Sequence, residues 1–321
     1  MKIAVAGYGN LGKAAVGAIE NQTDMSLVGV FSRREPKTLF APKNVKIYPF
    51  DLIKSFEGKI DVVLNCNGSA RDLPLTTPFL ASAFNVVDAF DTHARILDHF
   101  KKTDFAARKA GTTAIIAVGW DPGLFSLSRL YMKSVLENPQ VYTFWGKGVS
   151  QGHTDAIREI DGVLFAREYT VPIESAVERV KNGTGSGLTE RKMHRRVCYV
   201  VPKENANTAL IEEKIKNMPE YFEGYETKVN FISLDDFLLE HKSMAHAGNV
   251  IALGRGEEGT DKIEFSLSAA SNPKITAGIL LAYARACFKM NKRGETGCKT
   301  VFDVRPVDIF QNSEKGTDEI L

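Results

Sequence analysis

The sequence of 321 residues lacks the features that mark metal-binding, nucleic-acid-binding and disulfide-rich proteins. Its four cysteines are scattered and form no Cys-x-x-Cys pair, which favours reduced thiols in a cytoplasmic protein. Its six histidines show no His-Glu-x-x-His spacing, so we expect no metal. The 41 Lys and Arg residues nearly balance 39 Asp and Glu residues, and the net charge of +2 predicts neither a nucleic-acid nor a membrane partner.

Long apolar runs and two common catalytic motifs are also missing. The best candidate for a membrane span, residues 275–290, is too short and contains Arg285 and Lys289, so we expect a buried helix there. We expect no targeting leader, because no charged-then-apolar segment opens the sequence. The sequence has no Gly-x-Ser-x-Gly elbow, and Ala14 directly after Lys13 argues against a phosphate-binding P-loop.

A glycine pattern near the start is the first informative feature that is present. It follows the apolar residues 3–6 and precedes a helix-like stretch at 13–20. In a dinucleotide fold, the first glycine makes a tight turn, the second lets the backbone approach a pyrophosphate, and the third lets helix and strand pack closely. The helix then directs its free N–H groups at the phosphates. The residues expected to contact a cofactor here are Gly7, Tyr8, Gly9, Asn10, Leu11 and Gly12.

The end of the next predicted strand identifies the cofactor more closely. NAD-binding proteins usually carry Asp or Glu about 20 residues after the glycine pattern, where the carboxylate holds the free ribose 2′-hydroxyl. This sequence instead has Ser32, Arg33 and Arg34 there. Arginine forks suit a phosphate dianion, so these residues predict NADP(H). The alternative is a solvated loop with two surface arginines.

Strand and helix signals alternate through the first 120 residues. Short apolar runs between helical patterns predict an α/β fold with a Rossmann-type, doubly wound parallel sheet. Ligands collect at the carboxyl ends of such strands, which makes the polar turn of Asn67, Gly68 and Ser69 a further candidate for cofactor binding. The expected strands are 2–6, 26–31, 45–48, 61–65, 85–88 and 113–118, and the expected helices are 11–21, 75–83 and 94–110.

The regular alternation of strand and helix signals ends after Pro122. We predict a dinucleotide-binding domain over residues 1–120 and a mixed α+β substrate domain over residues 121–273. We keep open whether the C-terminal segment, about 274–321, returns to the first domain. The elements expected in this half are helices at 123–136 and 274–291, antiparallel strands at 197–201 and 226–232, and a hairpin of 250–253 with 262–269.

Two glycine-containing segments hold both tryptophans of the sequence. They are Gly-Trp-Asp-Pro-Gly at 119–123 and Phe-Trp-Gly-Lys-Gly-Val-Ser-Gln-Gly-His at 144–153. Tryptophan offers a large apolar face with one donor, and adjacent glycines let backbone approach a ligand, although a packed domain junction would also use them. Asp88, Asp91 and Asp121 lie near predicted strand ends, where each can pair with a substrate ammonium or cap a helix.

Ten motifs together give the sequence a close resemblance to the meso-diaminopimelate dehydrogenase family. They occur in the family's order from Ile3 to about Ala286, and the two tryptophan segments are the most diagnostic. The motifs are VAGYGNLG, VGVFSRR, NGSA, VVDAFDTH, GWDPGLFS, FWGKGVSQGH, YTVP, HRR, MPEYF-GYE-VNF and SNPKITA.

The resemblance implies a homodimeric, NADP-dependent oxidoreductase whose second domain binds substrate and mediates dimerisation. The implied reaction is oxidative deamination of the D-centre of meso-2,6-diaminopimelate to L-2-amino-6-oxopimelate and ammonia, reversible as a branch of lysine biosynthesis. Met244-Ala245-His246 departs from the usual Met-Pro-His of the family. The substrate contacts that the motifs imply are Asp91, Trp120, Asp121, Trp145, Gln151, Gly152, Thr170, Arg196, His246 and Asn272.

These residue types suit a substrate that carries two ammonium and two carboxylate groups. Asp91 and Asp121 can bind ammonium. Arg196, with Thr170 and His246, can bind the carboxylate far from the reacting centre, since an arginine fork matches a carboxylate. Reading both ends of the substrate would select the meso isomer.

The reacting centre needs a second carboxylate site and a proton acceptor. Gln151 and the backbone N–H of Gly152 can hold the nearer carboxylate. Asp91, or a water that it holds, is our candidate for the proton acceptor, and Asp121 and His153 are its rivals. The alternatives to this function are an NADPH-dependent reductase of another amino or imino acid and a non-catalytic NADP-binding sensor.

Overall fold

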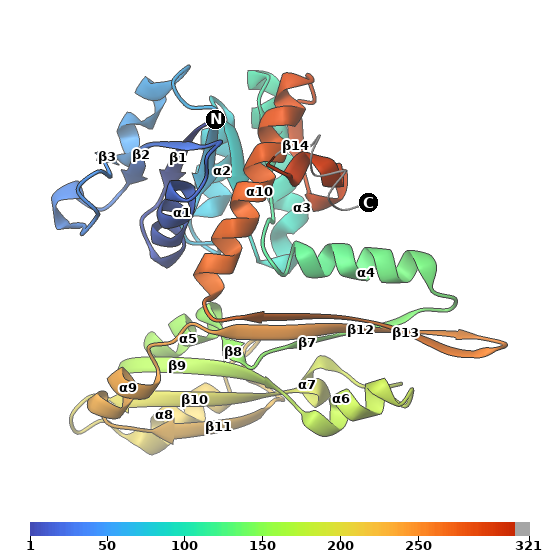
Figure 1. Cartoon of the computed structure of the whole chain (residues 1–321). Coiled ribbons are helices and arrows are strands. Elements are labelled where there is room, and N and C mark those ends of the chain that lie inside the picture. The colour runs from blue at the N-terminus through green and yellow to red at the C-terminus, as the bar shows by residue number, and fades with distance from the viewer. Residues whose placement is uncertain (312–321) are drawn as a thin grey trace. The chain divides into compact units, whose positions relative to one another are not determined.

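The chain separates into two compact units in a computed structural model that describes residues 1–311, apart from the side chain of Gln151 (Figure 1). Among the described residues, unit 1 comprises Met1–Leu127 together with residues 273–311, and unit 2 comprises Ser128–Asn272. These divisions lie close to the domain boundaries that the sequence suggests.

Unit 1 is built on a parallel sheet with the strand order of a doubly wound fold. Within residues 1–311 this sheet has seven strands in the order β14-β6-β5-β4-β1-β2-β3, and all neighbours run parallel. Strand β1 lies between β2 and β4, which makes the carboxyl end of β1 a switch point of the kind that binds ligands. The strands are β1 (Lys2–Ala6), β2 (Ser26–Ser32), β3 (Ile47–Pro49), β4 (Val62–Asn65), β5 (Asn85–Asp88), β6 (Thr113–Ile115) and β14 (Gly297–Lys299).

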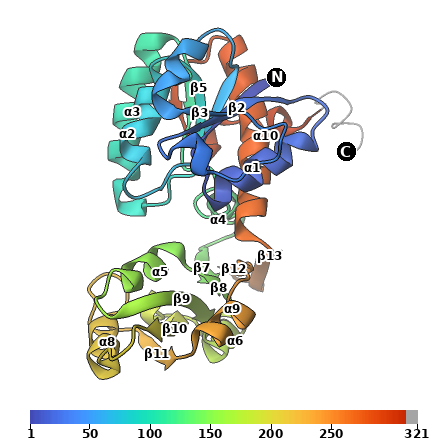
Figure 2. The same cartoon turned by 90° about the vertical axis from the view of Figure 1, so that its left-hand side faces the viewer.

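Helices cover both faces of this sheet (Figure 2). Alternation along β1 sends Ile3 and Val5 into one core with α1 and α10, and Ala4 and Ala6 into a second core with α2 and α3. Both faces are therefore apolar, as a parallel sheet requires. The helices are α1 (Asn10–Glu20), α2 (Leu73–Ala81), α3 (Ile96–Ala110) and α10 (Asn272–Lys292), with 3-10 turns η1 (Pro36–Thr38), η2 (Phe50–Phe56), η3 (His93–Arg95), η4 (Val301–Asp303) and η5 (Pro306–Ile309). Helix α4 (Leu124–Val135) begins in unit 1 and continues into unit 2.

Unit 2 contains two smaller sheets. Within the described residues, one has the order β11-β10-β9-β8 and the other the order β13-β12-β7. Strands β12 and β13 form a long antiparallel hairpin. The elements are β7 (Gln140–Trp145), β8 (Gly148–Val149), β9 (Val163–Pro172), β10 (His194–Pro202), β11 (Glu226–Phe231), β12 (His246–Gly256) and β13 (Gly259–Ala269), with α5 (Gln151–Arg158), α6 (Glu174–Lys181), α7 (Glu190–Met193), α8 (Thr208–Lys216) and α9 (Leu234–Glu240).

One sequence-based expectation about unit 2 is wrong. The strands expected at 197–201 and 226–232 run parallel to each other, because β10 pairs with β11 in parallel and takes its antiparallel partner, β9, on its other edge. A helix, α8, connects β10 to β11, which permits a parallel crossover that no local turn signal announces.

The expected α/β class is confirmed, and the expected helix at residues 275–290 lies within α10. One face of α10 is buried in the core of unit 1, where it packs with residues of β1 and α1. Among the described helices, none is long and apolar enough to cross a membrane.

Candidate active site

The loop between β1 and α1 is tight at its ends and open at its centre. Gly7 has φ +93°, and its N–H donates to the Phe31 carbonyl at 2.8 Å. A Cβ at Gly12 would lie 2.1 Å from the Gly7 carbonyl oxygen, whereas a Cβ at Gly9 would meet no described atom within 4 Å. The loop thus needs glycine for its turn and its packing, and it leaves the backbone at Gly9 accessible to a ligand.

Two guanidinium groups follow β2 beside this loop. Arg34 donates through Nη2 to the Tyr8 carbonyl at 2.5 Å, and its backbone N–H donates to the hydroxyl of the buried Ser32 at 3.1 Å. Arg33 pairs with Asp72 at 2.5 Å, and 54% of its side chain is exposed. The end of β2 therefore presents cations and a hydroxyl where an NAD-binding site would present a carboxylate.

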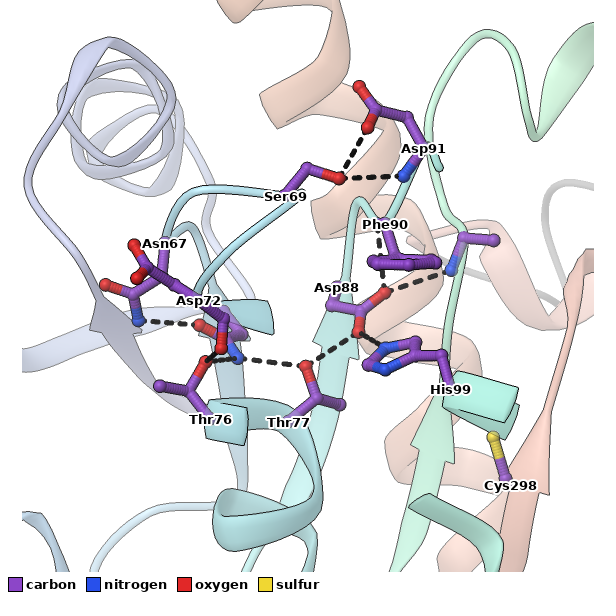
Figure 3. Close-up of polar contacts among 12 residues, drawn as sticks. Asn67, Ser69, Asp72, Thr76, Thr77, Asp88, Phe90, Asp91, His99 and Cys298 are labelled. Carbon is purple, nitrogen blue, oxygen red and sulfur yellow. Dashed lines mark hydrogen bonds and ion pairs between the residues drawn. The ribbon is translucent and has the colours of Figure 1, made fainter. Parts of the chain in front are cut away.

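The turn of residues 67–69 after β4, which we expect to contact the cofactor, is hydrogen-bonded to Asp91 (Figure 3). Asn67 donates to the Asn65 side chain at 2.8 Å. The Ser69 hydroxyl donates to the Asp91 carboxylate at 2.5 Å and accepts from the Asp91 backbone N–H at 3.0 Å. Asp91 is exposed and Thr92 is the N-cap residue of η3, so the helix-cap alternative for Asp91 is wrong. Its carboxylate is held in place and accessible.

Asp88 cannot contact a substrate, because it is fully buried under these loops. Its Oδ2 accepts from the Thr77 hydroxyl at 2.7 Å and lies 2.6 Å from Nε2 of His99. Its Oδ1 accepts from the backbone N–H groups of Phe90 at 3.1 Å and Ala117 at 3.0 Å. Figure 3 shows these bonds converging from several segments on one carboxylate.

The Gly-Trp-Asp-Pro-Gly segment folds back on itself. Gly123 has φ +132°, and a Cβ there would lie 1.7 Å from the Gly119 carbonyl oxygen. The Phe125 N–H donates to the Trp120 carbonyl at 2.8 Å, and the two aromatic rings meet edge to face with centroids 5.1 Å apart. Trp120 and its neighbour Asp121 are half-buried, so both residues of this folded-back loop are partly exposed.

In unit 2, the second tryptophan segment packs directly on expected substrate residues. A Cβ at Gly146 would lie 2.0 Å from the Thr170 carbonyl oxygen. A Cβ at Gly148 would lie 2.3 Å from the ring of His246. The glycines therefore allow this turn to lie against Thr170 and His246, which any larger residue would push away.

His194, which the sequence reasoning missed, orients the backbone of Trp145. Its Nε2 accepts the Trp145 N–H at 2.9 Å, and its Nδ1 donates to the Glu190 carbonyl at 3.1 Å. Burial lowers the pKa of His194 to about 4, so the ring is neutral near pH 7 and both nitrogens keep these roles.

Arg196 on β10 is a buried cation with few partners. Its Nη1 donates to the Thr170 hydroxyl, and its guanidinium lies 4.2 Å from the centroid of the Tyr225 ring. Its nearest carboxylate oxygen among the described residues is Oε1 of Glu168, 3.9 Å from Nη1. An arginine held this way can receive a carboxylate from a ligand.

The start of α5 carries Gln151 and Gly152, the residues expected to hold the nearer carboxylate of the substrate. Gln151 is its first residue, but its side chain lies outside the described part of the structure. Gly152 is exposed, and a Cβ there would meet no described atom within 4 Å. His153 packs edge-on against Phe222, and its Nδ1 lies 2.6 Å from the Ser150 hydroxyl. Burial lowers the pKa of His153 to about 3, which makes it a weak base.

The structure thus brings the expected residues together as two groups, one in each unit. In unit 1, Ser69 contacts Asp91; in unit 2, Thr170 contacts Arg196, and Asn272 donates its N–H to the carbonyl of Met244, close in sequence to His246. Glu168 was missed, although the buried alternation of β9 places it on the same face as Thr170. No group of three His, Cys, Asp or Glu side chains within residues 1–311 could hold a metal ion.

Comparison with known proteins identifies relatives along the whole chain. Residues 119–271 match the family of the diaminopimelic acid dehydrogenase C-terminal domain. The meso-diaminopimelate D-dehydrogenase of Ureibacillus thermosphaericus is 50% identical over 305 residues, which cover 95% of this chain and 94% of that protein.

Solved structures agree with this relationship. The structure of C. glutamicum DAP dehydrogenase in complex with DAP superposes with a TM-score of 0.95 at 38% identity, and covers 100% of this chain and 99% of that one. An engineered D-amino acid dehydrogenase bound to NADP+ has a TM-score of 0.91 at 36% identity, with the same coverage of both chains.

Proposed function

The chain belongs to the meso-diaminopimelate D-dehydrogenase family, and from this premise we propose how its residues divide the work of the reaction. The activity is oxidative deamination of the D-centre of meso-2,6-diaminopimelate, with water, to L-2-amino-6-oxopimelate and ammonia, and its reverse serves lysine biosynthesis. When bound, an oxidised nicotinamide accepts the hydride from the substrate Cα. The protein binds and orients the substrate and takes up the proton.

We propose NADP as the cofactor, and the residues of unit 1 fit it. The accessible backbone at Gly9 suits a pyrophosphate, and the turn of Asn67, Gly68 and Ser69 ends the strand beside it. Arg33 and Arg34, with the hydroxyl of Ser32, would hold the 2′-phosphate. A phosphate dianion would compete with Asp72 for Arg33, an exchange that free ribose hydroxyls could not drive.

For the substrate, the proposal assigns the carboxylates and the ammonium groups to different residues. Arg196 carries this assignment, because a buried guanidinium whose closest described carboxylate oxygen is 3.9 Å away can take a carboxylate ligand. Thr170 and His246 complete the site for the distal carboxylate. Gln151 and Gly152 are proposed to bind the nearer carboxylate, and Asp91 and Asp121 to bind ammonium. The remaining proposed substrate contacts, which would line the site and orient the substrate, are Trp120, Trp145 and Asn272.

Asp91 is the proton acceptor that the local geometry favours. It is exposed, and Ser69 fixes its carboxylate from two directions. His153 is a poorer candidate because Ser150 lies at its Nδ1 and its pKa of about 3 opposes protonation. Asp121 stays as the second catalytic candidate, on a loop that holds it half-buried.

A homodimer in the cytoplasm completes the proposal. Three apolar side chains of α4 are exposed, Leu130 (50%), Tyr131 (68%) and Val135 (54%), which suits a contact surface for a second copy. The four cysteines are free and buried, as in a reducing compartment. Light scattering on the purified protein tests the dimer.

The activity itself is tested by following NADPH absorbance with meso-diaminopimelate and either NADP+ or NAD+. The proposal expects rapid NADPH formation and little NADH. Turnover with NAD+ alone would overturn the cofactor assignment. Cofactor binding without any turnover would favour a sensor, and turnover with other amino acids alone would favour a different dehydrogenase.

A further inference from the structure

Glu168 is a buried carboxyl group beside Thr170 and Arg196, two of the three residues proposed to bind the distal carboxylate. It is 0% exposed, and its Oε1 lies 3.3 Å from the Thr170 hydroxyl and 3.9 Å from Nη1 of Arg196. Its Oε2 has no hydrogen-bond partner among the described residues. A charged carboxylate would leave this oxygen unpaired in the protein interior, which is costly, whereas a neutral acid would leave only a carbonyl lone pair.

Arg196 does not form a close ion pair with Glu168. The 3.9 Å separation exceeds a hydrogen-bond distance, and the buried Nε of Arg196 also lacks a partner among the described residues. The guanidinium is held instead by the Thr170 hydroxyl and by the face of the Tyr225 ring. The cation therefore keeps bonding capacity that a tight internal salt bridge would consume.

The groups around Glu168 make it the one that titrates near neutral pH. Burial raises the pKa of Glu168 to about 8, against the opposing effects of Arg196, Thr170 and the Ser150 backbone. On β10, burial raises the pKa of the Cys198 thiol far above neutral. The two histidines that interact with Arg196, His153 on α5 and His194 on β10, have pKa values lowered to about 3 and about 4 by burial. None of these three changes charge between pH 6 and pH 10.

We propose that Glu168 is a positioning residue that sets substrate affinity: as the neutral acid it leaves Arg196 and Thr170 free for the distal carboxylate, and as the anion it competes for them. This inference rests on the proposed function, because it takes the ligand of Arg196 to be that carboxylate. The neutral acid donates a hydrogen bond to the Thr170 hydroxyl oxygen, and the hydroxyl hydrogen of Thr170 is then available to the substrate. The anion accepts that hydrogen and attracts the guanidinium.

The test compares wild type with E168Q, whose amide can donate to Thr170 but cannot ionise. We expect equal KM values for meso-diaminopimelate at pH 7. At pH 9 the wild-type KM should exceed that of E168Q by about tenfold, since only the protonated fraction binds well. The ratio of the two KM values cancels the titration of the substrate's ammonium groups. The values of kcat and the KM for NADP+ should stay equal, which a general folding defect would not allow.

E178Q is the matched control, because Glu178 is an exposed glutamate of the same unit. Its KM should follow wild type at every pH. Parallel pH profiles for wild type and E168Q would overturn the inference while leaving the proposed function intact. Absence of wild-type turnover would overturn the proposed function instead.

A second measurement needs no variant. Infrared spectra of the wild-type protein with NADP+ should show the carbonyl stretch of a protonated carboxylic acid at pH 7, when exposed carboxyls are ionised. That band should disappear when the pH is raised above 9. At pH 7 the band should be retained when meso-diaminopimelate is added. A spectrum without the band at pH 7 would overturn the inference even if E168Q failed to fold.

Discussion

The Oδ2 of Asp88 lies 2.6 Å from Nε2 of His99, and both side chains are buried beneath the loops that carry Asp91 and Asp121. The same carboxylate accepts the N–H groups of Phe90 and Ala117, which lie one residue before Asp91 and a few residues before Asp121. One buried anion thus connects two loops that we expect to contact the substrate (Figure 3).

Replacing Asp88 with alanine should destabilise unit 1 severely. The change removes one carboxylate but leaves His99, Thr77 and two backbone N–H groups without their acceptor. Breaking a buried, hydrogen-bonded charge in this way costs roughly 3–5 kcal/mol. Urea unfolding measures the loss, with D98A as the control, because Asp98 forms an exposed ion pair on α3. Equal unfolding midpoints for D88A and D98A would contradict the importance of the buried network.

Removing both arginines after β2 should weaken NADPH binding selectively. Each supplies a charge-assisted hydrogen bond to the proposed 2′-phosphate, so R33A/R34A should raise the KM for NADPH roughly tenfold to hundredfold. The KM for the amino acid substrate should change little. K37A/K43A removes the same charge from exposed positions of unit 1 and should behave as wild type. Unchanged NADPH affinity in R33A/R34A would remove the argument for NADP.

Replacing Arg196 with methionine should cripple use of diaminopimelate. The apolar side chain leaves the distal carboxylate unpaired in a buried site, and losing one partner of a charged pair costs roughly 2–5 kcal/mol in kcat/KM. Arg195 offers the matched control, because it is the exposed neighbour of Arg196 on β10 and points to the other face of the sheet. If R195M and R196M gave the same kcat/KM, Arg196 would have no special role.

Replacing Asp91 with asparagine should reduce turnover while NADPH still binds. A general base contributes about 10²–10⁴-fold to rate, and asparagine cannot take a proton. Steady-state kcat with saturating substrates, together with calorimetric titration of NADPH, separates the two effects. Normal turnover by D91N would exclude Asp91 as the proton acceptor and leave Asp121 as the candidate.

Unit 1 was predictable because its signals are local. Strand β1 was expected at 2–6 and β5 at 85–88, and both have those bounds, since short apolar runs ended by polar turns suffice to define buried parallel strands. The parallel pairing of β10 with β11 was not predictable in the same way. It depends on a helical crossover and on a partner strand far along the chain, and neither leaves a mark in the strand's own residues.

The residues of the candidate site also differ in whether the sequence alone could identify them. Motif residues such as Thr170 and Arg196 were found by resemblance, and the structure adds that they contact each other. Glu168 contacts Thr170 and Arg196, and His194 accepts the backbone N–H of Trp145. These supporting contacts form only in the folded chain, where β9, β10 and β7 lie close together. The period-two pattern of β9, which buries Ala166, Glu168 and Thr170 in turn, is the one sequence signal that could have drawn attention to Glu168.

The stability of E168Q relative to wild type should rise with pH between about 4.5 and about 8. Folding raises the pKa of Glu168 from 4.5 to about 8, so the folded protein binds this proton more tightly than the unfolded chain does. The stabilisation from Glu168 is therefore complete below pH 4.5 and is lost as pH rises toward 8. His153, whose pKa folding lowers, has the opposite sign, because the unfolded chain then binds the proton more tightly and stability rises with pH up to its ordinary pKa of 6.5.

The difference between the two proteins isolates Glu168 from that opposing titration, since both keep His153. Urea unfolding of wild type and E168Q at pH 5, 6.5 and 8 measures it. We expect the difference in unfolding free energy to shift steadily in favour of E168Q across the series, and E178Q to show no such trend. A constant difference would mean that Glu168 is already ionised in the folded protein at pH 5, and the attraction of the Arg196 charge, 3.9 Å away, would then have outweighed its burial.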